Sequence, residues 1–163
     1  MKRIGIVGVG LLGTAVASRL LEGGFEVAGY DTLPGQLVPL RSRGLVAAAS
    51  LADAATNADA IFTILPSPDS VEAAFLGTGG LLDAAPPSAT LIQMSTISPA
   101  LTRRLADAAA AKARAFLDAP MSGTSAMVAR GDCVIFVGGD GGHLRSTWAR
   151  PAWPRSPSSR RIS

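Results

Sequence analysis

Residues 3–13, Arg-Ile-Gly-Ile-Val-Gly-Val-Gly-Leu-Leu-Gly, decide which fold this sequence predicts. Residues 3–9 form an apolar run rich in valine and isoleucine, which is typical of a strand buried on both faces of a parallel sheet. Leu11–Glu22 then carries apolar side chains at helical spacing and stops at a Gly-Gly pair. The stretch therefore predicts a strand, a tight glycine turn and a helix in immediate succession.

The rest of the chain repeats this alternation of strand and helix. Further strands are expected at Glu26–Tyr30, 45–48, 60–65, 90–94, Ala115–Asp118 and 133–137. Helices are expected at 35–43, 51–56, 68–76 and 124–129, and from Ser98-Pro99 onward. The helix at 35–43 is the weakest of them, because Pro39 lies inside it and lacks a backbone N–H. This order predicts an α/β domain with a Rossmann-type, doubly wound, mainly parallel sheet covered by helices on both faces.

The glycine turn carries the most informative motif, Gly8-Val9-Gly10-Leu11-Leu12-Gly13. A G-x-G-x-x-G pattern between a strand and a helix is typical of a loop that binds the pyrophosphate of a dinucleotide. Gly10 lacks a Cβ, so the phosphates can come close, and the helix N-terminus offers them free amides. The alternative is a glycine turn in an α/β fold that binds nothing.

Asp31 stands eighteen residues after Gly13, at the end of the second strand. A carboxylate at that place accepts hydrogen bonds from the ribose hydroxyls of NAD and repels the 2′-phosphate of NADP. The next residues bring no positive charge until Arg41, so NAD is the expected cofactor and NADP the less favoured one. Asp31 alternatively does no more than cap a turn. No metal site is expected.

Composition limits the remaining possibilities. The 163 residues are 48% hydrophobic and 17% charged, which fits one globular domain, and no apolar run is long enough to cross a membrane. The single cysteine, Cys133, cannot form an internal disulfide, and the first residues lack a cleavage pattern, so a cytoplasmic protein is expected. Residues 1–142 carry ten basic and twelve acidic residues, so nucleic-acid binding by this part is not supported.

The last 21 residues have a different character. Residues 143–163 hold five arginines, five serines, three prolines and both tryptophans, without an acid and without helical or strand periodicity. The expected organisation is therefore a domain at 1–142 followed by an irregular basic tail that is disordered. Two alternatives remain for the tail: contact with an anionic partner, or origin from a shifted reading frame.

Four stretches together resemble the β-hydroxyacid dehydrogenases, a family that includes 3-hydroxyisobutyrate dehydrogenase, tartronate semialdehyde reductase and, more distantly, 6-phosphogluconate dehydrogenase. They are the glycine motif, Ile64-Leu65-Pro66, Ser95-Thr96-Ile97-Ser98-Pro99 and Asp118-Ala119-Pro120-Met121-Ser122-Gly123. The resemblance implies that Leu65 and Pro66 cover the adenosine side of the cofactor. It also implies that Ser95 and Thr96 lie beside the nicotinamide and that Ser122, Gly123 and Thr124 hold a small hydroxyacid.

Three departures from the family pattern qualify the resemblance. Gln93 stands where the family usually has an acid, and Thr124 replaces a glycine, so its Cβ is expected to crowd the substrate or restrict the turn. The family's catalytic lysine and its following all-helical domain have no counterpart here, because Lys2 and Lys112 match neither position. No catalytic residue is therefore assigned in this chain. It is expected to bind NAD weakly and to turn over little. A homodimer and a separately encoded C-terminal domain are the two partners that the sequence leaves open.

Two other functions remain open from the sequence. One is a non-catalytic dinucleotide-binding module that senses NAD or regulates a partner. The other is an imine reductase or related semialdehyde reductase of the same architecture, which does not use the lysine. Because those enzymes favour NADP, Asp31 argues against this second alternative.

Overall fold

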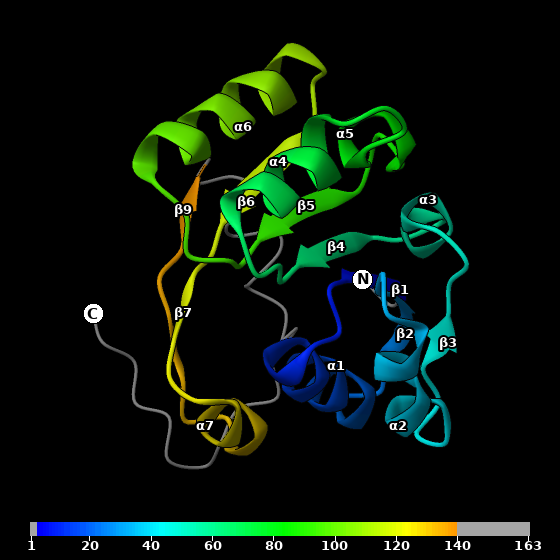
Figure 1. The fold of residues 1–163 in the computed structure, drawn as a ribbon. Coiled ribbons are helices and arrows are strands. Elements are labelled where there is room, and N and C mark those ends of the chain that lie inside the picture. Colours follow the sequence, from blue (N-terminus) through cyan, green and yellow to red (C-terminus); the bar gives the residue numbers. More distant parts are fainter. Residues whose placement is uncertain (1–2, 140–163) are drawn as a thin grey trace.

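A computed structural model describes residues 3–139 and shows a seven-stranded sheet in which β1 lies between β2 and the central strand β4 (Figure 1). The strand order is β3-β2-β1-β4-β5-β6-β9, parallel throughout except for the antiparallel edge pair of β6 and β9. The predicted Rossmann-type, mainly parallel sheet is therefore confirmed. The strands are β1 (Arg3–Val7), β2 (Glu26–Tyr30), β3 (Val46–Ala47), β4 (Ala60–Thr63), β5 (Thr90–Gln93), β6 (Ala115–Asp118), β7 (Met121–Ser122), β8 (Val134–Ile135) and β9 (Gly138–Gly139).

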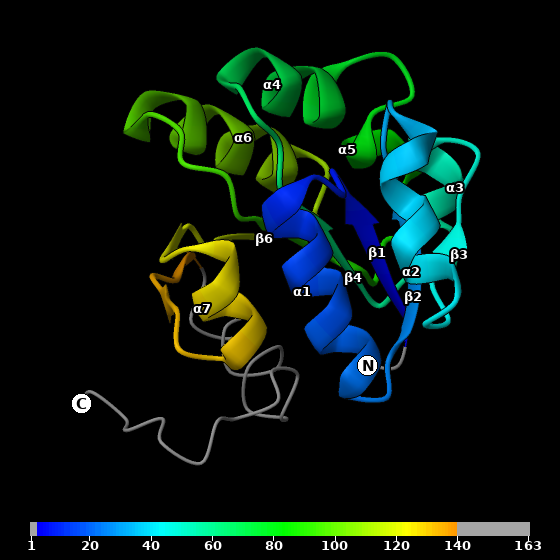
Figure 2. The same ribbon diagram turned by 60° about the horizontal axis from the view of Figure 1, so that its bottom comes forward.

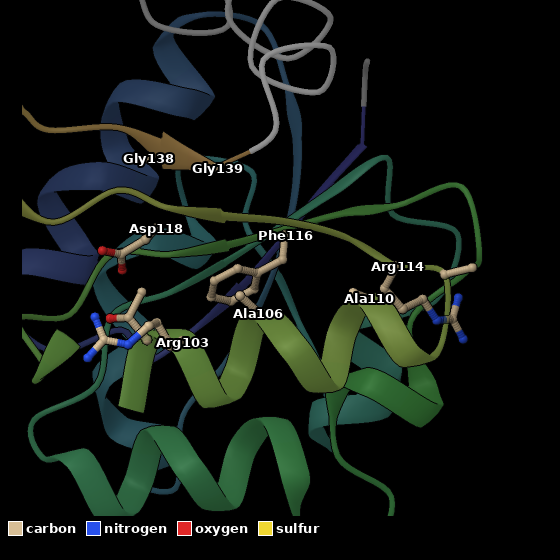
Figure 3. A pocket seen from close by; sticks show the side chains of 10 residues that line it. Arg103, Ala106, Ala110, Arg114, Phe116, Asp118, Gly138 and Gly139 are labelled. Atoms are coloured by element: carbon tan, nitrogen blue, oxygen red, sulfur yellow. The ribbon is translucent and has the colours of Figure 1, made fainter. Parts of the chain in front are cut away.

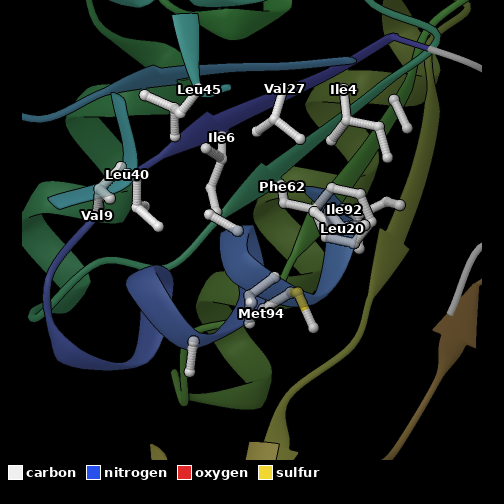
Figure 4. Packing of buried hydrophobic residues seen from close by; sticks show 14 of the residues in the cluster. Ile4, Ile6, Val9, Leu20, Val27, Leu40, Leu45, Phe62, Ile92 and Met94 are labelled. Atoms are coloured by element: carbon white, nitrogen blue, oxygen red, sulfur yellow. The ribbon is translucent and has the colours of Figure 1, made fainter. Parts of the chain in front are cut away.

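Helices cover both faces of this sheet, and alternate residues of each strand point to opposite faces. The helices are α1 (Leu11–Glu22), η1 (Pro34–Leu37), α2 (Val38–Arg41), α3 (Leu51–Ala55), α4 (Pro68–Leu76), α5 (Leu81–Ala84), α6 (Pro99–Ala111) and α7 (Ser125–Arg130). On one face, Ile4 and Ile6 of β1 and Phe62 of β4 pack with α1, α2 and α7 (Figure 4). On the other face, Val7 and Ile61 pack with α3, α4, α5 and α6, and Figure 2 shows the two layers of helices from the side.

These two cores fix the position of the strand ends. Ile6, Leu20 and Phe62 are all buried, and burying side chains of this size stabilises a fold by roughly 1.5–3 kcal/mol each. Strand order reverses between β1 and β4, so the loops after these strands diverge to opposite sides. A crevice at such a point, outside the carboxyl ends of the strands, is where open α/β sheets bind ligands.

The predicted helix at 35–43 is wrong in detail. The structure has a 3₁₀ turn, η1, followed by the short helix α2. Pro39 lies in the first turn of α2, where backbone N–H groups have no acceptor within the helix. The missing N–H of proline therefore costs nothing there, and Pro39 fits the start of this helix. The four-residue helix α5 was not predicted, because it is too short to carry a periodic pattern.

The predicted single strand at 133–137 is also wrong. Its first part, β8, pairs antiparallel with β7, and the chain then enters the edge strand β9. The reason lies in the backbone around α7: Gly123 has φ +142° and Gly131 has φ +78°, so the chain reverses direction on both sides of the helix. Residues 121–135 therefore form a hairpin around α7, which packs against α1 (Figure 2).

The expected tail at 143–163 lies outside the described residues. Within residues 3–139, no helix combines the length and the apolar character that a membrane span requires.

Candidate dinucleotide-binding site

A side chain is excluded at Gly8 and Gly13 of the first turn by close backbone atoms, but not at Gly10. A Cβ on Gly8 would lie 2.1 Å from the carbonyl oxygen of Ile64, and the φ of Gly8 is +91°, which side chains rarely adopt. A Cβ on Gly13 would lie 2.0 Å from the carbonyl oxygen of Gly8, so this glycine brings α1 against the strand. A Cβ on Gly10 would meet nothing within 4 Å. The fold therefore requires a glycine at positions 8 and 13, whereas the space beside Gly10 is free for something else.

The N-terminus of α1 faces that free space. Gly10 is the N-cap of the helix and has no side chain to bond the first amides, those of Leu11, Leu12 and Gly13. The first amides of a helix lack an intrahelical acceptor, and the helix dipole places partial positive charge there. Thr14 steadies the turn, because its hydroxyl donates to the carbonyl oxygen of Val9 at 3.1 Å. This arrangement suits an anion such as a pyrophosphate.

Asp31 connects the glycine turn to the end of β2. One carboxylate oxygen accepts a hydrogen bond from the amide of Val9 at 2.7 Å, and the other accepts from the amide of Leu33 at 2.8 Å. The carboxylate therefore orders both loops, as the turn-capping alternative expected. Each oxygen keeps a second acceptor position for a ligand hydroxyl, because a carboxylate offers about four lone-pair sites.

A cavity of about 700 Å³ joins these elements. Its size fits the 300–1,000 Å³ range of small-molecule sites. Neither lysine nor arginine is among its described lining residues, and both Leu65 and Pro66 belong to them. The lining comes from the glycine turn (Gly8, Gly10, Leu11, Leu12, Gly13), from the end of β2 (Tyr30, Asp31, Thr32, Leu33), from the loop after β4 (Ile64, Leu65, Pro66) and from α4 (Ser70, Ala73, Ala74).

Ser95 and Thr96 follow β5 and differ in their surroundings. Ser95 is buried, and its hydroxyl accepts a hydrogen bond from the amide of Leu65 at 2.8 Å, whereas the side chain of Thr96 is exposed. Neither residue lines the cavity beside Gly10. Ser95 thus ties the loop after β4 to the loop after β5, and a direct contact of either residue with nicotinamide stays a prediction.

The expected substrate loop lies outside the main sheet. Ser122 is an exposed residue of β7 and Gly123 is the turn residue after it. The short helix expected at 124–129 begins after these two residues, because Thr124 is its N-cap and its hydroxyl accepts a hydrogen bond from the amide of Met127 at 3.3 Å. Thr124 has φ −84°, which any residue adopts, so its Cβ does not restrict the turn. The roles of Ser122, Gly123 and Thr124 toward a substrate stay predictions.

Comparison with known proteins decides the family. Residues 3–148 match the family model described as the NAD binding domain of 6-phosphogluconate dehydrogenase. The chain belongs to this family.

Relatives of this NAD-binding domain are oxidoreductases. The NAD-dependent L-serine dehydrogenase of Pseudomonas aeruginosa is 36% identical over 93% of this chain and 50% of its own length. The structure of 3-hydroxyisobutyrate dehydrogenase from Mycobacterium tuberculosis with L-serine has a TM-score of 0.86 and 30% identity, covering 93% of this chain and 50% of that one. An imine reductase of Myxococcus stipitatus with NADP⁺ has a TM-score of 0.84 at 19% identity, covering 94% and 52%, which shows the shared fold alone. The chain thus spans about half the length of the curated relatives it matches.

Two further polar residues of the NAD-binding domain can be placed. Cys133 is half-buried against the core beside α1 and α7, and burial raises the pKa of its thiol, so it is a weak nucleophile. Lys112 ends α6 and forms an ion pair with Asp83 at the start of the neighbouring helix α5. Lys112 is therefore engaged away from the cavity beside Gly10.

Asp118, at the end of β6, supplies the clearest pH dependence. Burial raises the pKa of this carboxyl above its usual value, and a hydrogen bond from Gln93 opposes the shift. A raised pKa in the folded state means that the folded protein binds the proton more tightly than the unfolded chain. The contribution of Asp118 to stability is therefore present below its unfolded pKa and is lost as pH rises through its folded pKa.

The substitution Asp118→Asn is expected to remove this loss, because asparagine still accepts from Gln93 and never ionises. Thermal unfolding of both proteins should give melting temperatures whose difference, variant minus wild type, becomes more positive as pH rises from about 4 to about 7. A difference that stays constant over this range would contradict the assignment. Asp107→Asn, an exposed carboxylate on α6, is the matched control.

Proposed function

We propose that this chain binds NAD(H) in the cavity beside Gly10 and serves as the dinucleotide-binding part of a 3-hydroxyacid dehydrogenase. The observation that carries the proposal is the open space that a Cβ of Gly10 would enter, directly at the N-terminus of α1. In this arrangement the amides of Leu11, Leu12 and Gly13 donate hydrogen bonds to the pyrophosphate, and Asp31 accepts hydrogen bonds from the ribose hydroxyls. Leu65 and Pro66 cover the adenosine side. When bound, the nicotinamide supplies the hydride chemistry, and the protein supplies position and electrostatics.

The proposed preference for NAD over NADP rests on charge. Asp31 is the carboxylate that a 2′-phosphate would approach, and none of the described residues that line the cavity is a lysine or an arginine. A phosphate beside an uncompensated carboxylate is repelled, since two unit charges about 4 Å apart interact by roughly 4 kcal/mol at the effective dielectric of a protein surface. The name of the Pseudomonas aeruginosa relative, an NAD-dependent enzyme, supports the same preference.

The substitution Asp31→Asn tests this preference. We expect wild-type protein to bind NADH at least about tenfold more tightly than NADPH, and the variant to narrow that ratio by about tenfold, which corresponds to about 1.4 kcal/mol. Fluorescence titration with each reduced cofactor measures both affinities. Asp107→Asn on the outer surface of α6 controls for the loss of one negative charge. Equal affinities of wild-type protein for NADH and NADPH would contradict the NAD assignment.

The proposed substrate class is a small carboxylic acid with a hydroxyl on the third carbon. L-Serine and 3-hydroxyisobutyrate, the compounds in the names of the Pseudomonas aeruginosa and Mycobacterium tuberculosis relatives described above, share this group. Ser122 and Gly123 offer an exposed hydroxyl and a backbone amide at the turn after β7, and Thr124 lies next to them. We propose that these three residues hold the carboxylate of the substrate, as the family resemblance implies.

Turnover by this chain alone is proposed to be slow. Proton transfer by a positioned side chain typically contributes 10²–10⁴-fold to the rate of a reaction. Lys112 is not placed for this role, because it forms an ion pair with Asp83 away from the cavity. A homodimer or a separately encoded C-terminal domain, in a cytoplasmic setting, would then complete the site. A steady-state assay with 3-hydroxyisobutyrate and NAD⁺ tests this part of the proposal. Rates typical of an enzyme, about 1–10³ per second, would contradict it.

A further inference from the structure

A buried amide side chain connects the ends of two neighbouring strands, β5 and β6. Gln93, the last residue of β5, is fully buried. Its Nε2 donates to the carbonyl oxygen of Ser95 at 2.7 Å and to Oδ1 of Asp118 at 3.0 Å. Its Oε1 accepts a hydrogen bond from the amide of Ser95. The side chain therefore folds the loop after β5 back on itself and bonds it to the end of β6.

The partners of Gln93 require an amide in one orientation. Both hydrogens of Nε2 point at acceptors, the carbonyl of Ser95 and the carboxylate of Asp118, whereas Oε1 faces a donor. An ionised carboxylate in place of this amide would have no hydrogen to donate to its two neighbouring acceptors. An apolar side chain would leave the polar groups of Ser95 and Asp118 without this hydrogen-bond partner. Leaving one such group unsatisfied costs about 1–3 kcal/mol.

The same network reaches the wall of the cavity beside Gly10. The hydroxyl of Ser95 accepts from the amide of Leu65 at 2.8 Å, and Leu65 lines that cavity. Asp118, at the other end, lines a second cavity of about 680 Å³ between α6 and the β6–β9 edge (Figure 3). Hydrogen bonds thus run continuously from Asp118 through Gln93 and Ser95 to Leu65, from one cavity to the other.

We infer that Gln93 is a positioning residue that holds the loops after β4 and β5 in the shape that receives the dinucleotide. The inference rests on the proposed function, since it concerns binding in the same cavity. Gln93 touches no ligand in this account and acts only through Ser95 and Leu65. A loop that is already ordered before binding pays less conformational entropy when the ligand arrives, so the network raises affinity by preorganisation.

The charged groups around this network are few. Asp118 is the titratable group that Gln93 contacts, and burial raises the pKa of its carboxyl. Arg103 of α6 and Arg114 line the second cavity together with Asp118, and neither forms an ion pair with it in the described part of the chain. The strand β9 contributes only Gly138 and Gly139 to this cavity (Figure 3). A second carboxylate placed at position 93 would therefore act mainly on Asp118.

The decisive variant is Gln93→Glu. Its carboxyl must carry a proton to donate to Asp118, and a buried carboxyl beside another carboxylate has its pKa raised by up to 3–5 units from about 4.3. Calorimetric titration with NAD⁺ should give an affinity within about threefold of wild type at about pH 5.5 and at least about tenfold weaker at about pH 8.5. Wild-type affinity should change by less than about twofold over this range, because Gln93 does not titrate and its Nε2 can donate to Asp118 whether that carboxyl is ionised or protonated.

Two companion variants keep the test independent of folding. Gln93→Glu combined with Asp118→Asn removes the second carboxylate, and it should recover at least about half of the lost affinity on a logarithmic scale at pH near 8.5. Gln93→Met has similar length and no charge, and it should weaken NAD⁺ by about three- to tenfold at every pH. If Gln93→Glu does not fold at high pH, Gln93→Met alone decides the matter.

Leu105→Val is the control for loss of stability alone. Leu105 is buried in the apolar core under α6, and its side chain takes no part in the hydrogen-bond network, so this variant should lower the melting temperature and leave NAD⁺ affinity unchanged. The inference is overturned if folded Gln93→Glu and Gln93→Met bind NAD⁺ as wild type does at every pH, or if Leu105→Val weakens binding equally. In both cases wild-type binding still supports the proposed function, whereas a folded wild-type protein that does not bind NAD⁺ refutes that function itself.

Discussion

Gly10→Ala is expected to lose dinucleotide binding while keeping the fold. The added Cβ meets no protein atom within 4 Å, so the apo structure has room for it. The methyl group then occupies the place where the pyrophosphate must approach the amides of Leu11 and Leu12. We expect NAD⁺ affinity to fall at least about 100-fold, or about 2.7 kcal/mol, as measured by calorimetric titration.

The free energy of unfolding should change little in Gly10→Ala. Alanine is a poorer N-cap than glycine, but it also restricts the unfolded chain, and these effects of roughly 0.5–1 kcal/mol oppose each other. Gly138→Ala is the matched control, because its Cβ also meets nothing within 4 Å and β9 lies outside the cavity beside Gly10. A Gly10→Ala protein that binds NAD⁺ as tightly as wild type would refute the pyrophosphate assignment.

Gly8→Ala is expected to have the opposite effect, a large loss of stability. Its Cβ would lie 2.1 Å from the carbonyl oxygen and 2.9 Å from the carbonyl carbon of Ile64, and its φ of +91° is unfavourable for alanine. Backbone strain of this kind costs about 1–3 kcal/mol, and overpacking adds about 1–3 kcal/mol. The expected melting temperature is therefore lower by about 10 °C, at roughly 2–4 °C per kcal/mol for a domain of this size.

Thermal unfolding followed by circular dichroism measures this difference, with Gly10→Ala measured beside it. The two variants carry the same chemical change two positions apart, so only their surroundings distinguish them. A melting temperature of Gly8→Ala within about 2 °C of wild type would show that the turn can move away from Ile64 at little cost. The assignment of Gly8 to the stability of the turn and of Gly10 to ligand binding would then be wrong.

The main features of the fold follow from patterns that are local in sequence. The apolar run before Gly8 predicts β1, and Ser67-Pro68 and Ser98-Pro99 mark the starts of α4 and α6, which the structure confirms. Such signals depend on capping and on burial of one segment, so a single sequence is enough to carry them.

The region around α7 was harder because its structure depends on contacts distant in sequence. Residues 133–137 contain the apolar content of a buried strand, but Val134 and Ile135 pair with β7, and the β6 edge pairs with the next residues, Gly138 and Gly139. No periodicity in the segment itself records where its partners end. The glycines at positions 123 and 131 were the available signal, since glycines on both sides of a short helix are typical of chain reversal.

The candidate site also has a part that sequence spacing predicts and a part that depends on contacts distant in sequence. The roles of Gly8 and Gly13 and the place of Asp31 at the end of β2 follow from motif spacing. The bond of Gln93 to Asp118 does not, because it joins two strands through residues that lie 25 positions apart in the sequence. The sequence marked Gln93 only as a departure from a family pattern, and the packing of β5 beside β6 was needed to show what its amide contacts.

The most direct test of the account is a ¹⁵N–¹H NMR titration of the folded chain with NAD⁺. Binding at the N-terminus of α1 predicts that the backbone amides of residues 9–13 shift first and most, together with Asp31 and Leu33, while those of the outer helix α6 stay in place. A well-dispersed spectrum of folded protein whose glycine-turn amides do not move with added NAD⁺, even at about 1 mM, would contradict the central claim that this turn receives the diphosphate.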